Sequence, residues 1–238
     1  MVVSIIIASL LAIIFMAIRV TIGTKSAQGG VIAMFVKAIA SLGFIAVGVT
    51  AIYNGVSNIQ AAIFVIAGLI FGLIGDMVLD LKVVYLKTPE EGVYLTGGMV
   101  SFAIGHVMYL VAMCLFFGNK VSLSLIGICV AVAAIVALGL VLGGEKFMGF
   151  RFENFTIHSI VYAFFLLFMS AFSIGLCIMI KTSKPVLFTV GMVLFLLSDL
   201  VLTSMYFGGR PKDKTLCIIN HALYYAAQIC IAAYIFAM

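Results

Sequence analysis

The stretch NIQAAIFVIAGLIFGLIGDMVLD occupies residues 58–80 and decides the class of fold. It carries no charge until Asp76, and a second aspartate, Asp80, follows one helical turn later. A helix needs roughly 20 apolar residues to cross the hydrocarbon core of a bilayer, so this stretch is long enough to span a membrane. A membrane β-barrel would instead show short segments of alternating hydropathy. The stretch therefore predicts a transmembrane helix that carries carboxylates.

The rest of the chain follows the same pattern. Of its 238 residues, 66% are hydrophobic and 9% are charged, and the mean hydropathy is +1.36. Soluble domains are closer to half apolar and a quarter charged. We therefore predict an all-α integral membrane protein, a single polytopic domain over residues 1–238 with eight transmembrane helices. The predicted spans are residues 2–20, 31–53, 58–80, 94–117, 121–143, 156–180, 185–207 and 216–237.

The distribution of Lys and Arg predicts the orientation. The loops after the odd-numbered spans carry Arg19, Lys25, Lys82, Lys87, Lys146, Arg151, Arg210, Lys212 and Lys214, and the loops on the other side carry Lys120, Lys181 and Lys184. Because cytoplasmic loops are enriched in Lys and Arg, both termini are expected outside, in what we interpret as a bacterial inner membrane. The net charge of +5 is attributed to contact with anionic membrane lipids, and no nucleic acid is expected as a partner.

Several polar residues are predicted to share one depth inside the membrane. A charge near the bilayer centre costs at least about 2.5–3.5 kcal/mol, so such residues normally face a protein interior and mark a site. A rise of about 1.5 Å per residue places these groups roughly 6–12 Å below the cytoplasmic boundary, where a polar pocket is predicted. Asp80 is nearest to this boundary, and a solvated helix end explains it equally well. The residues at this depth are Lys37, Asp76, Asp199, Asn220 and His221.

A short pattern occurs twice in the chain. A small residue precedes an intramembrane Asp, and His-x-x-Tyr follows one helix later, which places imidazole and phenol on one helix face. The two copies are four spans apart and run in the same direction. They predict two parallel four-helix halves, residues 1–117 and 118–238. The first copy is Gly75-Asp76 with His106 and Tyr109, and the second is Ser198-Asp199 with His221 and Tyr224.

These motifs, with Lys37 early in the second span and the run from Tyr224 to Gln228, resemble the YhhN-like lysoplasmalogenase family. The resemblance covers essentially the whole chain. One departure is Ala38, where the family pattern usually has a proline after the lysine. The resemblance implies a hydrolase acting on lysoplasmalogens, which are lysophospholipids with an alkenyl chain. Cleavage of the sn-1 vinyl ether bond would release a fatty aldehyde and glycerophosphoethanolamine or glycerophosphocholine.

The intramembrane carboxyl groups are compatible with this reaction. Vinyl ether hydrolysis needs a proton at the β-carbon and a water molecule that captures the resulting oxocarbenium ion. One protonated and one ionised carboxyl can supply both, as in glycosidases. We hypothesise that Asp76 and Asp199 form this catalytic pair, either one being the acid, with no metal ion and no cofactor. Substrate binding is assigned to Lys37, Asp80, Asn220, His221 and Tyr224, with Lys37 either binding the phosphate or keeping one Asp ionised.

Two other classes of function stay open at this point. A zinc-dependent intramembrane lipid hydrolase would use His106, His158 and His221 with an aspartate, although the first two are predicted at different depths. A proton- or ion-coupled transporter would use the intramembrane aspartates and Lys37 as a relay, although few polar groups continue to the other side. Metal content with activity after chelation would test the first alternative. Flux into liposomes without lipid turnover would indicate the second.

Overall fold

A computed structural model of the chain confirms the predicted class of fold. The described residues are 1–23, 25–84, 91–211 and 213–238. Within them, eight helices are long and apolar enough to cross a membrane. Lys87 and Lys212, which entered the charge count above, lie outside this part of the chain. The helices are α1 (Val2–Ile18), α2 (Ala27–Tyr53), α3 (Ile59–Val84), α4 (Glu91–Phe117), α5 (Leu123–Phe147), α6 (Thr156–Ile180), α7 (Val186–Tyr206) and α8 (Lys214–Tyr234).

The outer faces of the helices are apolar, as expected for an integral membrane protein. Ile13 on α1 is 56% exposed and Ile135 on α5 is 71% exposed. In water such side chains would be a liability, whereas in a bilayer they contact lipid chains. The buried core is also mainly apolar. The polar residues inside the bundle therefore differ from the rest of the core as well as from the lipid-facing surface.

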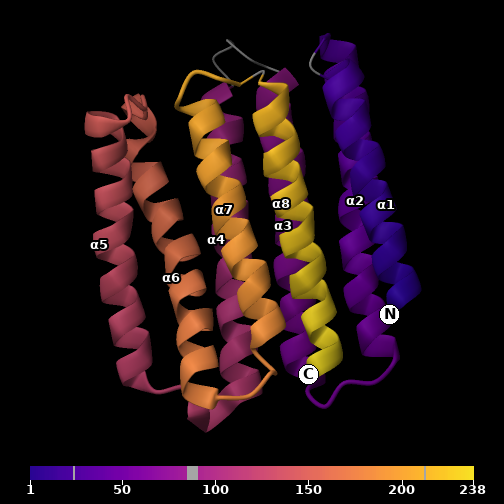
Figure 1. The fold of residues 1–238 in the computed structure, drawn as a ribbon, viewed down its shortest axis with the longest axis vertical. Coiled ribbons are helices and arrows are strands. Elements are labelled where there is room, and N and C mark those ends of the chain that lie inside the picture. Colours follow the sequence, from indigo (N-terminus) through magenta and orange to yellow (C-terminus); the bar gives the residue numbers. More distant parts are fainter. Residues whose placement is uncertain (24, 85–90, 212) are drawn as a thin grey trace.

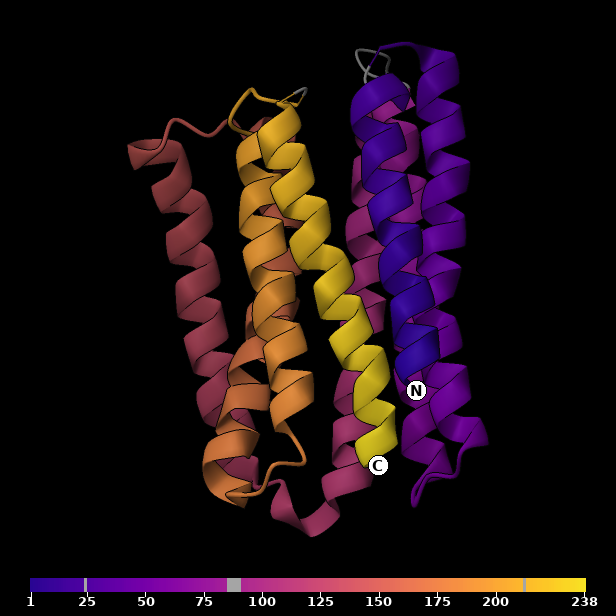
Figure 2. The same ribbon diagram turned by 45° about the vertical axis from the view of Figure 1, so that its right-hand side comes forward.

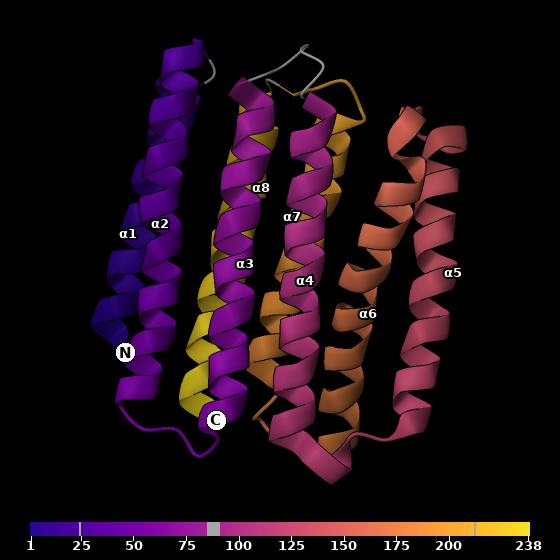
Figure 3. The same ribbon diagram turned by 180° about the vertical axis from the view of Figure 1, so that it is seen from behind.

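Helices that are consecutive in sequence pack as pairs: α1 with α2, α3 with α4, α5 with α6, and α7 with α8. The α1–α2 and α5–α6 pairs lie at the two sides of the bundle, with the other four helices between them (Figure 1). Seen from behind, α3 and α4 lie in front of α8 and α7 (Figure 3). Both termini lie at the same end of the bundle (Figure 2).

Contacts between the halves also follow a pattern. The contact of α2 with α8 has a counterpart in the contact of α6 with α4, since exchanging the two halves converts one into the other. This is the relation that an axis along the membrane normal would produce. The division into two repeated halves remains a prediction, as does the orientation in the membrane.

Small residues allow α3 and α4 to approach closely. A Cβ atom on Gly105 would lie 3.1 Å from the backbone oxygen of Gly68. A Cβ atom on Gly68 would lie 2.2 Å from Cε1 of Tyr109, whose side chain is fully buried. Small residues at helix interfaces let backbones approach in membrane proteins. This contact helps to set the rotation of α3, the helix that carries Asp76 and Asp80.

We expect Gly68→Ala to destabilise the protein by about 1–3 kcal/mol, because the new methyl group overlaps the Tyr109 ring in a packed interface. Thermal unfolding of the purified protein in detergent measures the effect. Gly127→Ala is the matched control, since a Cβ atom there would meet nothing within 4 Å. Equal unfolding temperatures for the two variants would show that the α3–α4 contact is looser than the structure indicates.

Candidate active site

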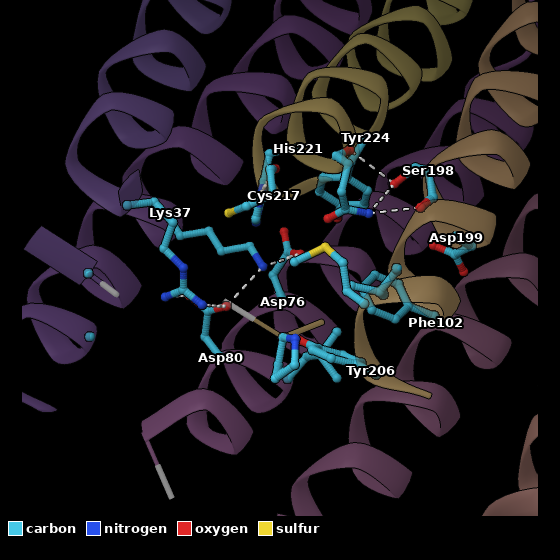
Figure 4. Close-up of a pocket in the computed structure, with 18 of the residues that line it drawn as sticks. Lys37, Asp76, Asp80, Phe102, Ser198, Asp199, Tyr206, Cys217, His221 and Tyr224 are labelled. Carbon is cyan, nitrogen blue, oxygen red and sulfur yellow. Dashed lines mark hydrogen bonds and ion pairs between the residues drawn. The ribbon is translucent and has the colours of Figure 1, made fainter. Parts of the chain in front are cut away.

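A polar cavity of about 310 Å³ lies inside one end of the bundle (Figure 4). Lys25 and Pro211, from the α1–α2 and α7–α8 connections, are part of its wall, so it reaches the end of the bundle where those connections lie. The structure brings together every site residue predicted from the sequence. Lys37, Asp76, Asp80, Asp199, Asn220, His221 and Tyr224 all line this cavity.

Lys37 forms the centre of a buried ion cluster. Its Nζ lies 3.1 Å from Oδ1 of Asp76 and 3.3 Å from Oδ1 of Asp80. The three residues are only 2–4% exposed. The four-residue spacing of the two aspartates puts both carboxylates on the face of α3 that meets Lys37 from α2. Lys37 is thus paired with both carboxylates inside the cluster.

Arg19 completes the cluster, and sequence reasoning counted it as a loop charge. It begins a π-helical turn, Arg19–Gly23, that continues α1, and it is 5% exposed. Its two terminal nitrogens lie 3.3 and 3.5 Å from the two oxygens of Asp80. π-helical turns often occur at functional sites. Asp80 is therefore a buried partner of two cations and not a solvated helix end.

A chain of two hydroxyl groups begins at the second oxygen of Asp76. The Ser41 hydroxyl donates to Oδ2 of Asp76 at 2.9 Å and lies 3.4 Å from the hydroxyl of Tyr225. Tyr224, which lines the same cavity as Asp76, accepts a hydrogen bond of 2.9 Å from the Gln228 side chain. Sequence reasoning missed Ser41 and Tyr225. The position of Ser41, one turn after Lys37, was the available signal.

Asp199 has a different environment. The Tyr162 hydroxyl of α6 donates a hydrogen bond to its Oδ2 atom. Within the described part of the chain, no Lys or Arg forms an ion pair with Asp199, whereas Asp76 is paired with Lys37. In Figure 4, Asp199 lies apart from the Lys37 cluster, on the side of the cavity formed by α7. The cavity thus holds one compensated and one uncompensated carboxyl group. Tyr162 was not predicted from the sequence.

The remaining predicted residues join α7 to α8. The Asn220 amide donates to the backbone oxygen of Ser198 at 2.8 Å and to its hydroxyl at 3.0 Å. His221 Nδ1 lies 2.7 Å from the backbone oxygen of Cys217. A carbonyl oxygen only accepts, so Nδ1 carries a proton and, in the neutral ring, Nε2 is the acceptor. Asn220 thus links α8 to α7 at the cavity wall, and His221 has a defined tautomer there.

The histidines of the zinc alternative do not converge. Among the described residues, no three His, Cys, Asp or Glu side chains are grouped closely enough to hold a metal ion. His106 is 1% exposed, and neither ring nitrogen hydrogen-bonds to any described residue. Its ring instead packs edge-on against Phe195, with ring centroids 5.1 Å apart, inside the range of about 4.5–7 Å that is typical of aromatic pairs. The geometry that a zinc site needs is therefore not provided by this part of the chain.

We expect His106→Leu to keep or raise the unfolding temperature, because it removes a buried polar group that makes no hydrogen bond. Asn220→Leu is the contrasting variant. It removes two hydrogen bonds to Ser198 and should cost about 1–2 kcal/mol. Thermal unfolding in detergent compares the two. A larger loss for His106→Leu than for Asn220→Leu would mean that His106 has a polar partner.

The fold and the cavity together define an integral membrane protein with an ionisable site inside its helical bundle. A comparison with family models matches the YhhN family over residues 32–235, and the chain belongs to this family. This confirms the family resemblance seen in the sequence motifs. No curated protein and no solved structure matches the chain.

Proposed function

We propose that this protein is a lysoplasmalogenase-like hydrolase that cleaves the sn-1 vinyl ether bond of lysoplasmalogens. Membership of the YhhN family supports the proposal. The observation that carries it is that Asp76 and Asp199 line one cavity but have unlike partners, a lysine for the first and a tyrosine hydroxyl for the second. The reaction needs such a difference between two carboxyl groups.

Charge balance suggests which carboxyl is the acid. Lys37 compensates a negative charge on Asp76, so Asp76 is the ionised member. No described cation is paired with Asp199, so a neutral Asp199 avoids an uncompensated charge inside the membrane. Asp199 is therefore the general acid in this proposal, and Tyr162 orients it.

In the proposed reaction these two residues carry every proton transfer and stabilise the intermediate, up to collapse of the hemiacetal. Asp199 gives its proton to the β-carbon of the vinyl ether, which leaves an oxocarbenium ion at the α-carbon and the ether oxygen. The Asp76 carboxylate stabilises this cation. Water attacks the α-carbon and returns a proton to Asp199, as the acid of a retaining glycosidase becomes a base. The hemiacetal then passes its hydroxyl proton to the glycerol oxygen as that C–O bond breaks, which yields a fatty aldehyde and glycerophosphoethanolamine or glycerophosphocholine.

A lysine at the cavity mouth suits the substrate phosphate. Lys25 lines the cavity and is exposed, whereas Arg19 and Lys37 are engaged by carboxylates. We further propose that the cavity faces the cytoplasmic side of a bacterial inner membrane with both termini outside. The lysoplasmalogen substrate and the surrounding membrane lipids are then the protein's partners.

The test uses the purified protein in detergent micelles with matched alkenyl and acyl lysophospholipids. Aldehyde and fatty acid are quantified by mass spectrometry. We expect aldehyde from the alkenyl lipids and no fatty acid from the acyl lipids. Fatty acid release would indicate an esterase instead. Proton or ion flux into liposomes without lipid turnover would replace this proposal with the transporter alternative.

A further inference from the structure

A second cavity adjoins the polar cavity. It measures about 490 Å³, within the roughly 300–1,000 Å³ typical of small-molecule sites. Asp199 and Phe102 line both cavities, as do Leu79, Leu202 and Tyr206. The two spaces are therefore neighbours, and Asp199 lies where they meet.

The second cavity, here called the apolar cavity, lies between α4, α6 and α7 with part of α5. Leu166 on its α6 wall is 3% exposed. Other lining residues belong to the outer surface: Leu140 on α5 is 43% exposed, Leu200 on α7 is 45% exposed and Met148 is 69% exposed. The lining of the apolar cavity thus extends from the junction at Asp199 to exposed apolar residues of the outer surface.

We infer that the apolar cavity holds the hydrocarbon chain of a single-chain lipid that reaches it sideways from the bilayer. The inference rests on the proposed function, because the bond at the base of this chain is the one cleaved. A chain lying between α6 and α7 places its first carbons at Asp199. The glycerol and phosphate then lie in the polar cavity, toward Lys25.

Chain length should matter through fit. A lipid chain that moves from the bilayer into an apolar cavity exchanges one apolar environment for another, so burial alone gives little preference. Steric limits of the wall then decide which chains are accommodated. Ala163 is a small residue in that wall, one position after Tyr162 on α6. A larger side chain at Ala163 should fill the space that the chain needs.

The test is photolabelling with a lysophospholipid that carries a diazirine at the end of an ether-linked saturated chain. This probe cannot be hydrolysed at a vinyl ether, so labelling reports binding alone. We expect saturable labelling of the α6 and α7 residues that line the apolar cavity, mapped by peptide mass spectrometry. Ala163→Phe should lower this labelling about tenfold, the size of effect that one misfitting group has in an apolar pocket.

Val161→Phe is the matched control, because Val161 is on the same helix, is 50% exposed and is not part of the cavity wall. The probe should label this variant to the same extent as the unmodified protein. Ala163→Leu, a smaller change, should give a smaller decrease and serves if the Phe variant does not fold. Saturable labelling only outside α6 and α7, or full labelling in a folded Ala163→Phe variant, would overturn the inference.

The outcome also separates this inference from the proposed function. Labelling of the apolar cavity without aldehyde release from vinyl ether lipids would retain the chain site and refute the hydrolase. Aldehyde release that is unaffected by Ala163→Phe, with no saturable labelling of the cavity, would retain the hydrolase and refute the chain site. If the protein both cleaves vinyl ether lipids and binds their chain in the apolar cavity, Ala163→Phe should reduce cleavage of long-chain substrates more than that of short-chain ones.

Discussion

Asp199→Asn is expected to lower the rate of aldehyde release by about 10²–10⁴-fold, the range lost when a general acid is removed. Asn has the size of Asp but no acidic proton to give to the vinyl ether. Its amide oxygen can still accept the hydrogen bond from Tyr162, so the fold should be kept. Initial rates from mass spectrometry, with thermal unfolding of the same preparation, measure both effects.

Two further variants test whether the loss of activity is specific to the Asp199 carboxyl group. Glu145→Gln neutralises an exposed acid outside the cavity and should leave the rate unchanged. Tyr162→Phe removes only the hydroxyl that orients Asp199, so it should have a smaller effect on the rate than Asp199→Asn. An Asp199→Asn variant with most of its activity would show that another group supplies the proton.

Lys37→Met is expected to be the most destabilising substitution in the site, at about 3–5 kcal/mol. It removes the cation that lies within 3.1 Å of Asp76 and 3.3 Å of Asp80 and leaves a buried carboxylate without compensation. Asp80 keeps Arg19 as a partner, so the loss falls mainly on Asp76. Unfolding in detergent, followed by circular dichroism, measures the change in stability.

The double variant Lys37→Met/Asp76→Asn tests whether the loss of stability comes from the uncompensated charge of Asp76. Removing both members of a buried ion pair is less costly than removing one, so the double variant should regain part of the lost stability. Lys181→Met is the control, because Lys181 is an exposed lysine after α6. Single and double variants with equal stability would argue against charge compensation as the function of Lys37.

The positions of the helices were predictable because they depend on local properties. Apolar runs long enough to span a bilayer mark the helices, and the predicted run 58–80 became Ile59–Val84. The differences lie at the ends. The second helix begins at Ala27 instead of residue 31, since the Ser26 hydroxyl accepts a hydrogen bond from the Gly29 amide and caps it. Gly29 and Gly30, which precede the predicted span, thus belong to the first turn of this helix.

The candidate site was predictable from charges inside apolar runs and from the repeated pattern that contains His221 and Tyr224. A charge inside an apolar run is rare enough to be noticed, which is how Lys37 and Asp199 were found. Serine and tyrosine are ordinary residues of membrane helices, so Tyr162 carried no signal and Ser41 only its position one turn after Lys37, although each hydrogen-bonds a candidate catalytic carboxyl. Arg19 was missed because a basic residue at the end of an apolar run normally reaches the headgroups.

The amino-acid sequence by itself determined that this chain has eight helices apolar enough to span a membrane and that carboxylates lie within its apolar runs. The length and hydropathy of a run are local properties, so no tertiary contact is needed to recognise them. Only the tertiary structure decided which groups meet there. Whether a carboxylate faces Lys37 or Tyr162 depends on how each helix is rotated against its neighbours. That rotation follows from contacts between distant parts of the chain, such as Gly68 against Tyr109. The difference between Asp76 and Asp199, on which the proposed chemistry depends, arises at this level.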